Sequence, residues 1–116
     1  MLINGDLIKD IFPEFITKLP KINIPIQGCT AYLFQGEKQQ IVFMRFDKDA
    51  IVPEHSHGCQ WEIVLDGKAD VYLNDEKKQY CKGDRFYVPA DTPHKARIYA
   101  GYTAIAIFDQ PDRYKI

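Results

Sequence analysis

The stretches HSHGCQWEIVLDG, from His55 to Gly67, and GDRFYVPADTPH, from Gly83 to His94, decide how this chain is interpreted. Together they contain all three histidines of the sequence. His55 and His57 are two residues apart, so their side chains leave the same face of a β-strand. His94 follows a proline-rich turn that can return the chain to that face. We therefore expect the three imidazoles to bind a metal ion; the alternative is three unrelated surface or core histidines.

Short apolar runs and turn residues alternate on both sides of these stretches. The Asp66-Gly67 dipeptide is suited to a tight hairpin turn, and Asn74-Asp75 begins another turn. The predicted strands are Thr30–Gln35, Gln40–Asp47, Ile51–His57, Trp61–Leu65, Lys68–Leu73, Gln79–Cys81, Arg85–Val88, His94–Tyr99 and Thr103–Phe108. Many short strands with almost no helix predict an all-β sandwich or barrel.

The two ends of the chain carry weaker signals. Residues 6–19 predict one short helical turn, which Pro13 interrupts and Pro20 ends. The tail DQPDRYKI, residues 109–116, is polar, and we expect it to lie across the surface. A length of 116 residues predicts a single domain over 1–116.

Composition excludes several classes of protein. The net charge is -1, and no basic stripe indicates a nucleic-acid partner. No apolar run reaches the length of a membrane span. Cys29, Cys59 and Cys81 are odd in number and without paired spacing, which favours free thiols in a reducing compartment. The N-terminal sequence MLINGDLIKDIF lacks the basic start of a signal peptide, so we expect a cytoplasmic protein.

The two histidine stretches resemble the two motifs of the cupin superfamily, in the right order. The first motif is G-x5-H-x-H-x3,4-E-x6-G, and the second is G-x5-P-x-G-x2-H-x3-N. The matching positions are His55, His57 and Gly67 in the first motif, and Gly83, Pro89 and His94 in the second. Three positions depart from the pattern, where Asp49, Asp91 and Ile98 replace Gly, Gly and Asn.

This resemblance implies a small single-domain cupin of type 2. Its fold is a β-barrel of the jelly-roll type, a double-stranded β-helix. The barrel core would cover about residues 30–108, with an N-terminal extension over 1–29. Cupins usually pair through their barrels, so the resemblance also implies a homodimer. The apolar segment Ile22–Ile26 is our candidate for the contact between the two subunits.

The family's glutamate ligand has two candidate positions in this chain. Counting back from Gly67 gives Gln60, whereas counting forward from His57 gives Glu62. We favour Gln60, because a hairpin at Asp66-Gly67 would fix the strand register from its closed end. Glu62 is then a catalytic base, or it is itself the acidic ligand. Cys59 lies between His57 and Gln60, and is a soft ligand, a redox-sensitive thiol or a partly buried free thiol.

The implied metal site consists of His55, His57, Gln60 and His94, with one divalent transition metal such as Fe, Mn, Zn or Ni. These neutral ligands would leave the charge of the ion unneutralised, which favours anionic substrates. The resemblance implies a metal-dependent enzyme on a small molecule, such as a dioxygenase or an isomerase or lyase. The alternatives are a non-catalytic ligand-binding or sensor module, and a closed zinc site that only stabilises the barrel.

Overall fold

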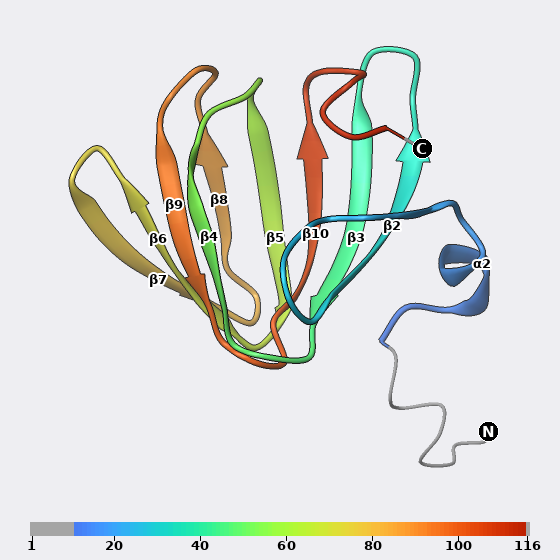
Figure 1. Ribbon diagram of the computed structural model, residues 1–116, viewed down its shortest axis with the longest axis horizontal. Helices are drawn as coiled ribbons and strands as arrows, with labels where there is room; N and C mark the ends of the chain where they lie inside the picture. The colour runs from blue at the N-terminus through green and yellow to red at the C-terminus, as the bar shows by residue number, and fades with distance from the viewer. Residues whose placement is uncertain (1–10, 116) are drawn as a thin grey trace.

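The computed structural model describes residues 11–115, which form two antiparallel β-sheets that face each other (Figure 1). The first sheet has the order β1 (Lys21–Ile22), β2 (Cys29–Gln35), β3 (Gln40–Phe46), β10 (Thr103–Phe108), β5 (Gln60–Asp66) and β8 (Arg85–Val88). The second has the order β4 (Ala50–His55), β9 (His94–Ile98), β6 (Lys68–Leu73) and β7 (Glu76–Cys81). This arrangement confirms the predicted all-β fold of packed sheets.

The chain passes from one sheet to the other at almost every connection after β3. Only β6 and β7 are consecutive strands within one sheet in this part of the chain. Their turn, at Asn74 and Asp75, has positive φ angles of 51° and 64°, as the sequence pattern of a tight hairpin predicts. The other connections in this part of the chain cross from one sheet to the other. Loops that are distant in sequence therefore lie at the same end of the sandwich (Figure 1).

The predicted hairpin at Asp66-Gly67 is wrong. β5 belongs to the six-stranded sheet and β6 to the four-stranded sheet, so this dipeptide carries the chain between them. Gly67 has a φ of 73°, and a Cβ atom there would lie 2.7 Å from the Tyr102 Cα atom. Glycine is therefore required by conformation and by close packing, which short-range sequence patterns do not distinguish from a hairpin turn.

The core lies between the two sheets and follows the alternation of the strands. In β3 the pattern is regular, because every second residue, from Gln40 to Phe46, is buried. β10 contributes Ala104, Ala106 and Phe108 to the same core. Cys29 belongs to its margin, where burial raises the pKa of the thiol to about 12. All three cysteines are free.

The N-terminal part of the described chain packs on the first sheet. The helix α2 (Glu14–Thr17) ends before Pro20, as the sequence predicts, but Pro13 is its N-cap and does not interrupt it. Residues 6–10 lie outside the described part. Ile22 is buried in the core of its own chain, and Ile24 and Ile26 pack against that core. In residues 11–115 no helix has the length and apolar character needed to cross a membrane.

The predicted strands are confirmed, with shifts of at most three residues at their ends. Two differences matter for the site. β4 ends at His55, so His57 lies in the following loop and not on the strand. The tail does not simply cross the surface, because Tyr114 packs against the core and Arg113 is half-buried.

Candidate functional site

His55 enters the site through an irregularity in β4. Ala50 and Val52 of β4 pack against the core, so simple alternation would direct Glu54 inward and His55 outward. The pairing of β4 with β9 shifts between Val52 and His55, which places His55 opposite His94. This bulge contains Pro53, which an edge strand such as β4 can accommodate.

His57 reaches the same place from the loop between β4 and β5. Its ring centroid lies 5.0 Å from that of His55 and 4.8 Å from that of His94. The loop is tied to the turn before β9, because the Asp91 N–H donates to the His57 carbonyl oxygen over 2.8 Å. Asp91 occupies the glycine position of the second motif and has a φ of 57°, a conformation that aspartate tolerates.

The three histidines form a compact cluster, with one candidate ligand atom from each lying within 4.8 Å of the others. Each Nδ1 atom is 2.7–2.8 Å from a backbone carbonyl oxygen, namely that of Pro53 for His55, Gly58 for His57 and Thr92 for His94. Because a carbonyl oxygen only accepts, each Nδ1 carries the proton and each Nε2 presents a lone pair. Metal-binding histidines are held in this way, so the cluster fits a metal ion.

Burial favours the neutral form of the imidazoles in the cluster. It lowers the pKa of His57 to about 4, against the opposing effect of the hydrogen bond to Gly58, and it also lowers the pKa of His94. Both imidazoles are therefore neutral at physiological pH, which is the state that binds metals. The Nε2 atom of His57 is buried without a hydrogen-bond partner. An unpaired polar atom of this kind is costly unless something binds it.

Gln60 and Glu62 both point into the sandwich from β5, since they are 9% and 4% exposed. The Gln60 amide donates from Nε2 to Glu62 Oε1 over 2.7 Å, and the Tyr102 hydroxyl donates to Glu62 Oε2. Both carboxylate oxygens of Glu62 are thus engaged, and they lie outside the group of metal-ligating atoms formed by the histidines. Gln60 also lines the cavity, and its hydrogen bond to Glu62 uses the amide nitrogen and not the amide oxygen.

Glu62 has an unusual protonation state for a carboxylic acid. Burial raises its pKa to about 7, although the hydrogen bonds from Tyr102 and Gln60 act in the opposite direction. Burial and the neighbouring Glu62 raise the pKa of Tyr102 well above its usual value. A carboxyl group with a pKa near neutral can both take up and release a proton, which suits a general acid or base.

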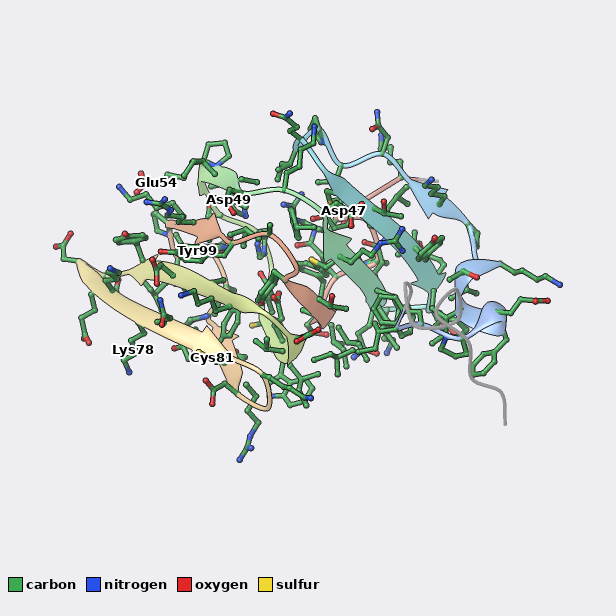
Figure 2. All side chains as sticks on the ribbon, turned by 90° about the horizontal axis from the view of Figure 1, so that it is seen from below. Asp47, Asp49, Glu54, Lys78, Cys81 and Tyr99 are labelled. Atoms are coloured by element: carbon green, nitrogen blue, oxygen red, sulfur yellow. The ribbon has the colours of Figure 1, made fainter. Side chains whose placement is uncertain are left out.

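These residues share one cavity of about 300 Å³ between the two sheets. It is lined mainly by apolar side chains, including Met44, Val52, Val71 and Phe108, with the three histidines, Gln60, Glu62 and Tyr102 on its wall. A mostly apolar cavity with a few converging polar groups is the usual form of a small-molecule site. Glu54 is exposed on the rim, and Figure 2 shows its side chain at the outer edge of the molecule beside β4.

Sequence reasoning missed Arg113 and Tyr114, which line the cavity from the C-terminal tail, and assigned no role to Tyr102. The polar composition of the tail indicated a surface segment, but Arg113 and Tyr114 line the cavity. The available signal was Gln40, a polar residue at an inward position of an apolar strand. Gln40 is fully buried and holds both backbone groups of Tyr114.

Cys59 lies beside the cluster but not in it. Its sulfur accepts a hydrogen bond from the Tyr87 hydroxyl over 3.0 Å, and it does not line the cavity. From the sequence, Cys59 could be a soft metal ligand or a partly buried thiol. This contact favours the partly buried thiol.

Comparisons with known proteins agree with this geometry. A protein of Methanocaldococcus jannaschii, the uncharacterised protein MJ1618, is 35% identical over 71 residues, covering 54% of this chain and 52% of that protein. The quercetin 2,3-dioxygenase of Bacillus subtilis is 32% identical over 75 residues, covering 63% of this chain and 22% of that enzyme. The chain thus spans about half of the first relative and less than a quarter of the second.

Among solved structures, an RmlC-like cupin from Shewanella frigidimarina is similar with a TM-score of 0.72 and 26% identity. The match covers 84% of this chain and 87% of that one. The family model described as the cupin domain matches residues 42–104, which is more than half of the chain and includes all three histidines. On this evidence the chain belongs to the cupin family.

Proposed function

We propose that this protein is a metal-dependent enzyme that acts on a small molecule in the cavity between the two sheets. The observation that carries the proposal is the histidine cluster, in which each imidazole is fixed through Nδ1 and the candidate ligand atoms lie within 4.8 Å of one another. Structural stabilisation by zinc alone is less well supported, since the cavity leaves room for a substrate beside the cluster.

The proposed ligands are His55, His57 and His94 through Nε2, and Gln60 through its amide oxygen. Glu62 supports this assignment of Gln60, because the hydrogen bond from Gln60 Nε2 turns the amide oxygen away from the carboxylate. Imidazole and amide ligands suit Fe, Mn, Zn or Ni. When bound, such an ion supplies Lewis-acid or redox chemistry at an open coordination position.

Two reaction classes have separate support. The relative from B. subtilis is a dioxygenase, which makes oxygen-dependent cleavage of a small molecule the first activity to assay. The hydrogen-bonded pair of Glu62 and Tyr102 in the cavity wall supports a proton-transfer reaction, as in an isomerase or lyase. In that reaction Glu62 would take a proton from the substrate and return it at another atom.

Metal content tests the site directly. We expect tag-free wild-type protein to contain about one equivalent of metal by mass spectrometry, and Gln60→Ala to lose most of it. Glu62→Ala should weaken metal binding by about 10–100-fold, because it releases the Gln60 amide. Gln79→Ala is the matched control, since Gln79 bonds to Asp70 on β6 and does not line the cavity.

A wild-type protein that contains no metal, and takes up none on titration, would overturn the proposal. A metal-loaded protein that binds small molecules tightly but converts none of them would favour the alternative, a ligand-binding module. Oxygen consumption separates the two enzyme classes, because only the dioxygenase requires O2.

A further inference from the structure

The cavity wall contains a positively charged side chain, that of Arg113. Arg113 lines the cavity together with the histidine cluster, and its positive charge contributes to lowering the pKa values of His57 and His94. Its Nε atom is buried without a hydrogen-bond partner. Within residues 11–115 no carboxylate forms an ion pair with Arg113. The buried Nε–H donor has no acceptor in the described part of the protein, and a bound anion would provide one.

Two carboxylates line the cavity, those of Glu62 and Glu54. Glu62 accepts hydrogen bonds from Tyr102 and Gln60, and no ion pair joins it to Arg113. Glu54 lies exposed at the rim. Among residues 11–115 neither carboxylate pairs with Arg113, so its guanidinium remains available to a bound anion.

The segment after β10 fixes Arg113 in place. Gln40 donates from Nε2 to the Tyr114 carbonyl oxygen over 2.7 Å and accepts the Tyr114 N–H over 3.0 Å. Gln110 accepts the Gly58 N–H, which attaches the segment to the loop that carries His57. The guanidinium stacks on the Tyr114 ring, with its Cζ atom 4.5 Å from the ring centroid. The arginine is thus pre-positioned, which lowers the entropic cost of binding a ligand.

We propose that Arg113 binds the carboxylate of the substrate, and that the substrate is a small molecule with an apolar body and one such carboxylate. This inference rests on the proposed function, since it assigns a substrate class to the same cavity. The apolar lining accommodates the body of the molecule, while the planar guanidinium suits a carboxylate. The four neutral ligands proposed for the metal would add to the attraction for an anion.

Binding of benzoate and of its neutral analogue benzamide tests the inference. The experiment uses ¹⁵N-labelled protein, both loaded with Zn²⁺ and treated with a chelator, in NMR titrations at pH 7.5. The Arg113 Nε–H signal is assigned by its absence from the spectrum of Arg113→Lys. We expect benzoate to shift this signal and to bind at least about tenfold more tightly than benzamide in both preparations.

Arg113→Gln should remove the preference for benzoate, and Arg113→Lys should keep part of it because the charge remains. Arg85→Gln is the matched control, since Arg85 is exposed on β8 outside the cavity and should leave the preference unchanged. The backbone spectrum of each variant verifies that it is folded.

The two proposals fail in different ways. Equal benzoate affinity in the wild type and in Arg113→Gln, in protein that holds zinc, would overturn the role of Arg113 and leave the metal site intact. A preference for benzoate that appears only in the zinc-loaded protein and ignores Arg113→Gln would also overturn it. Protein that binds no zinc but shows Arg113-dependent benzoate binding would support the anion site and overturn the metal enzyme.

Discussion

Gly67, the last residue of the first cupin motif, packs next to Tyr102, which lines the cavity. Its Cα atom lies against the backbone of Gly101 and Tyr102, and Tyr102 donates the hydrogen bond that holds Glu62. An added Cβ atom would meet three backbone atoms at 2.7–2.8 Å, and backbone atoms cannot move aside as the end of a side chain can. The glycine of the motif is therefore explained by packing beneath the site as well as by its φ of 73°.

We predict that Gly67→Ala lowers the free energy of unfolding by more than about 2 kcal/mol, because steric overlap adds to the strain of the positive φ. Urea denaturation measures this loss. Gly83→Ala is the matched control: its φ is 91°, but nothing lies within 4 Å of the added atom. We expect that variant to lose only about 1 kcal/mol, the cost of the backbone conformation. Equal losses in the two variants would contradict the packing argument.

At the scale of elements, the C-terminal segment depends on Gln40 at the start of β3. Gln40 is fully buried and makes three hydrogen bonds, two of them to the backbone of Tyr114. Gln40→Met preserves the volume but leaves the Tyr114 N–H and carbonyl groups unpaired. We predict a loss of about 1–3 kcal/mol in stability and faster hydrogen exchange at the Tyr114 amide.

Gln39→Met is the control for this prediction, because Gln39 is exposed and its side chain makes a single long hydrogen bond, to Asp109. It should change stability by less than about 0.5 kcal/mol. If exchange at Tyr114 were unchanged in Gln40→Met, the segment would be held by ring packing against Phe108 instead.

The elements themselves could be predicted from the sequence, but the connections between them could not. Alternating apolar residues and turn residues located the strands, because these signals are local. Whether Asp66-Gly67 closes a hairpin or crosses between sheets depends on which strands pair at long range, and no local pattern contains that information. The resemblance to the family placed the three histidines together although the strand argument for His57 was wrong.

The remaining parts of the site depend on tertiary contacts. His55 faces the cavity because a bulge in β4 shifts its register, and bulges follow from the pairing of two strands. Arg113 was missed because the polarity of its neighbours resembled a surface tail. The hydrogen bonds from Gln40 that bring this tail inward join residues 74 positions apart.

On the scale of the whole molecule, the outer face of the six-stranded sheet carries an apolar row. Its members lie directly opposite one another on successive strands: Phe34, Ile41, Ile107, Trp61 and Tyr87. Phe34 is 51% exposed, Trp61 38% and Tyr87 55%. An antiparallel sheet that faces water normally carries polar residues on that side, so a row of this kind favours an interface.

We predict that the protein is a homodimer that pairs through this row. The segment Ile22–Ile26, our candidate from the sequence, is used within its own chain, since Ile22 is in the core and Ile24 and Ile26 line the cavity. A sheet face can pack on its own copy about a two-fold axis, because the same row then meets itself.

Size-exclusion chromatography with light scattering should give twice the chain mass at micromolar concentration. Trp61→Arg and Phe34→Arg should give monomers, whereas Ile51→Arg, exposed on the other sheet, should remain dimeric. A monomeric wild type, or a dimer that persists in Trp61→Arg and Phe34→Arg, would contradict this interface.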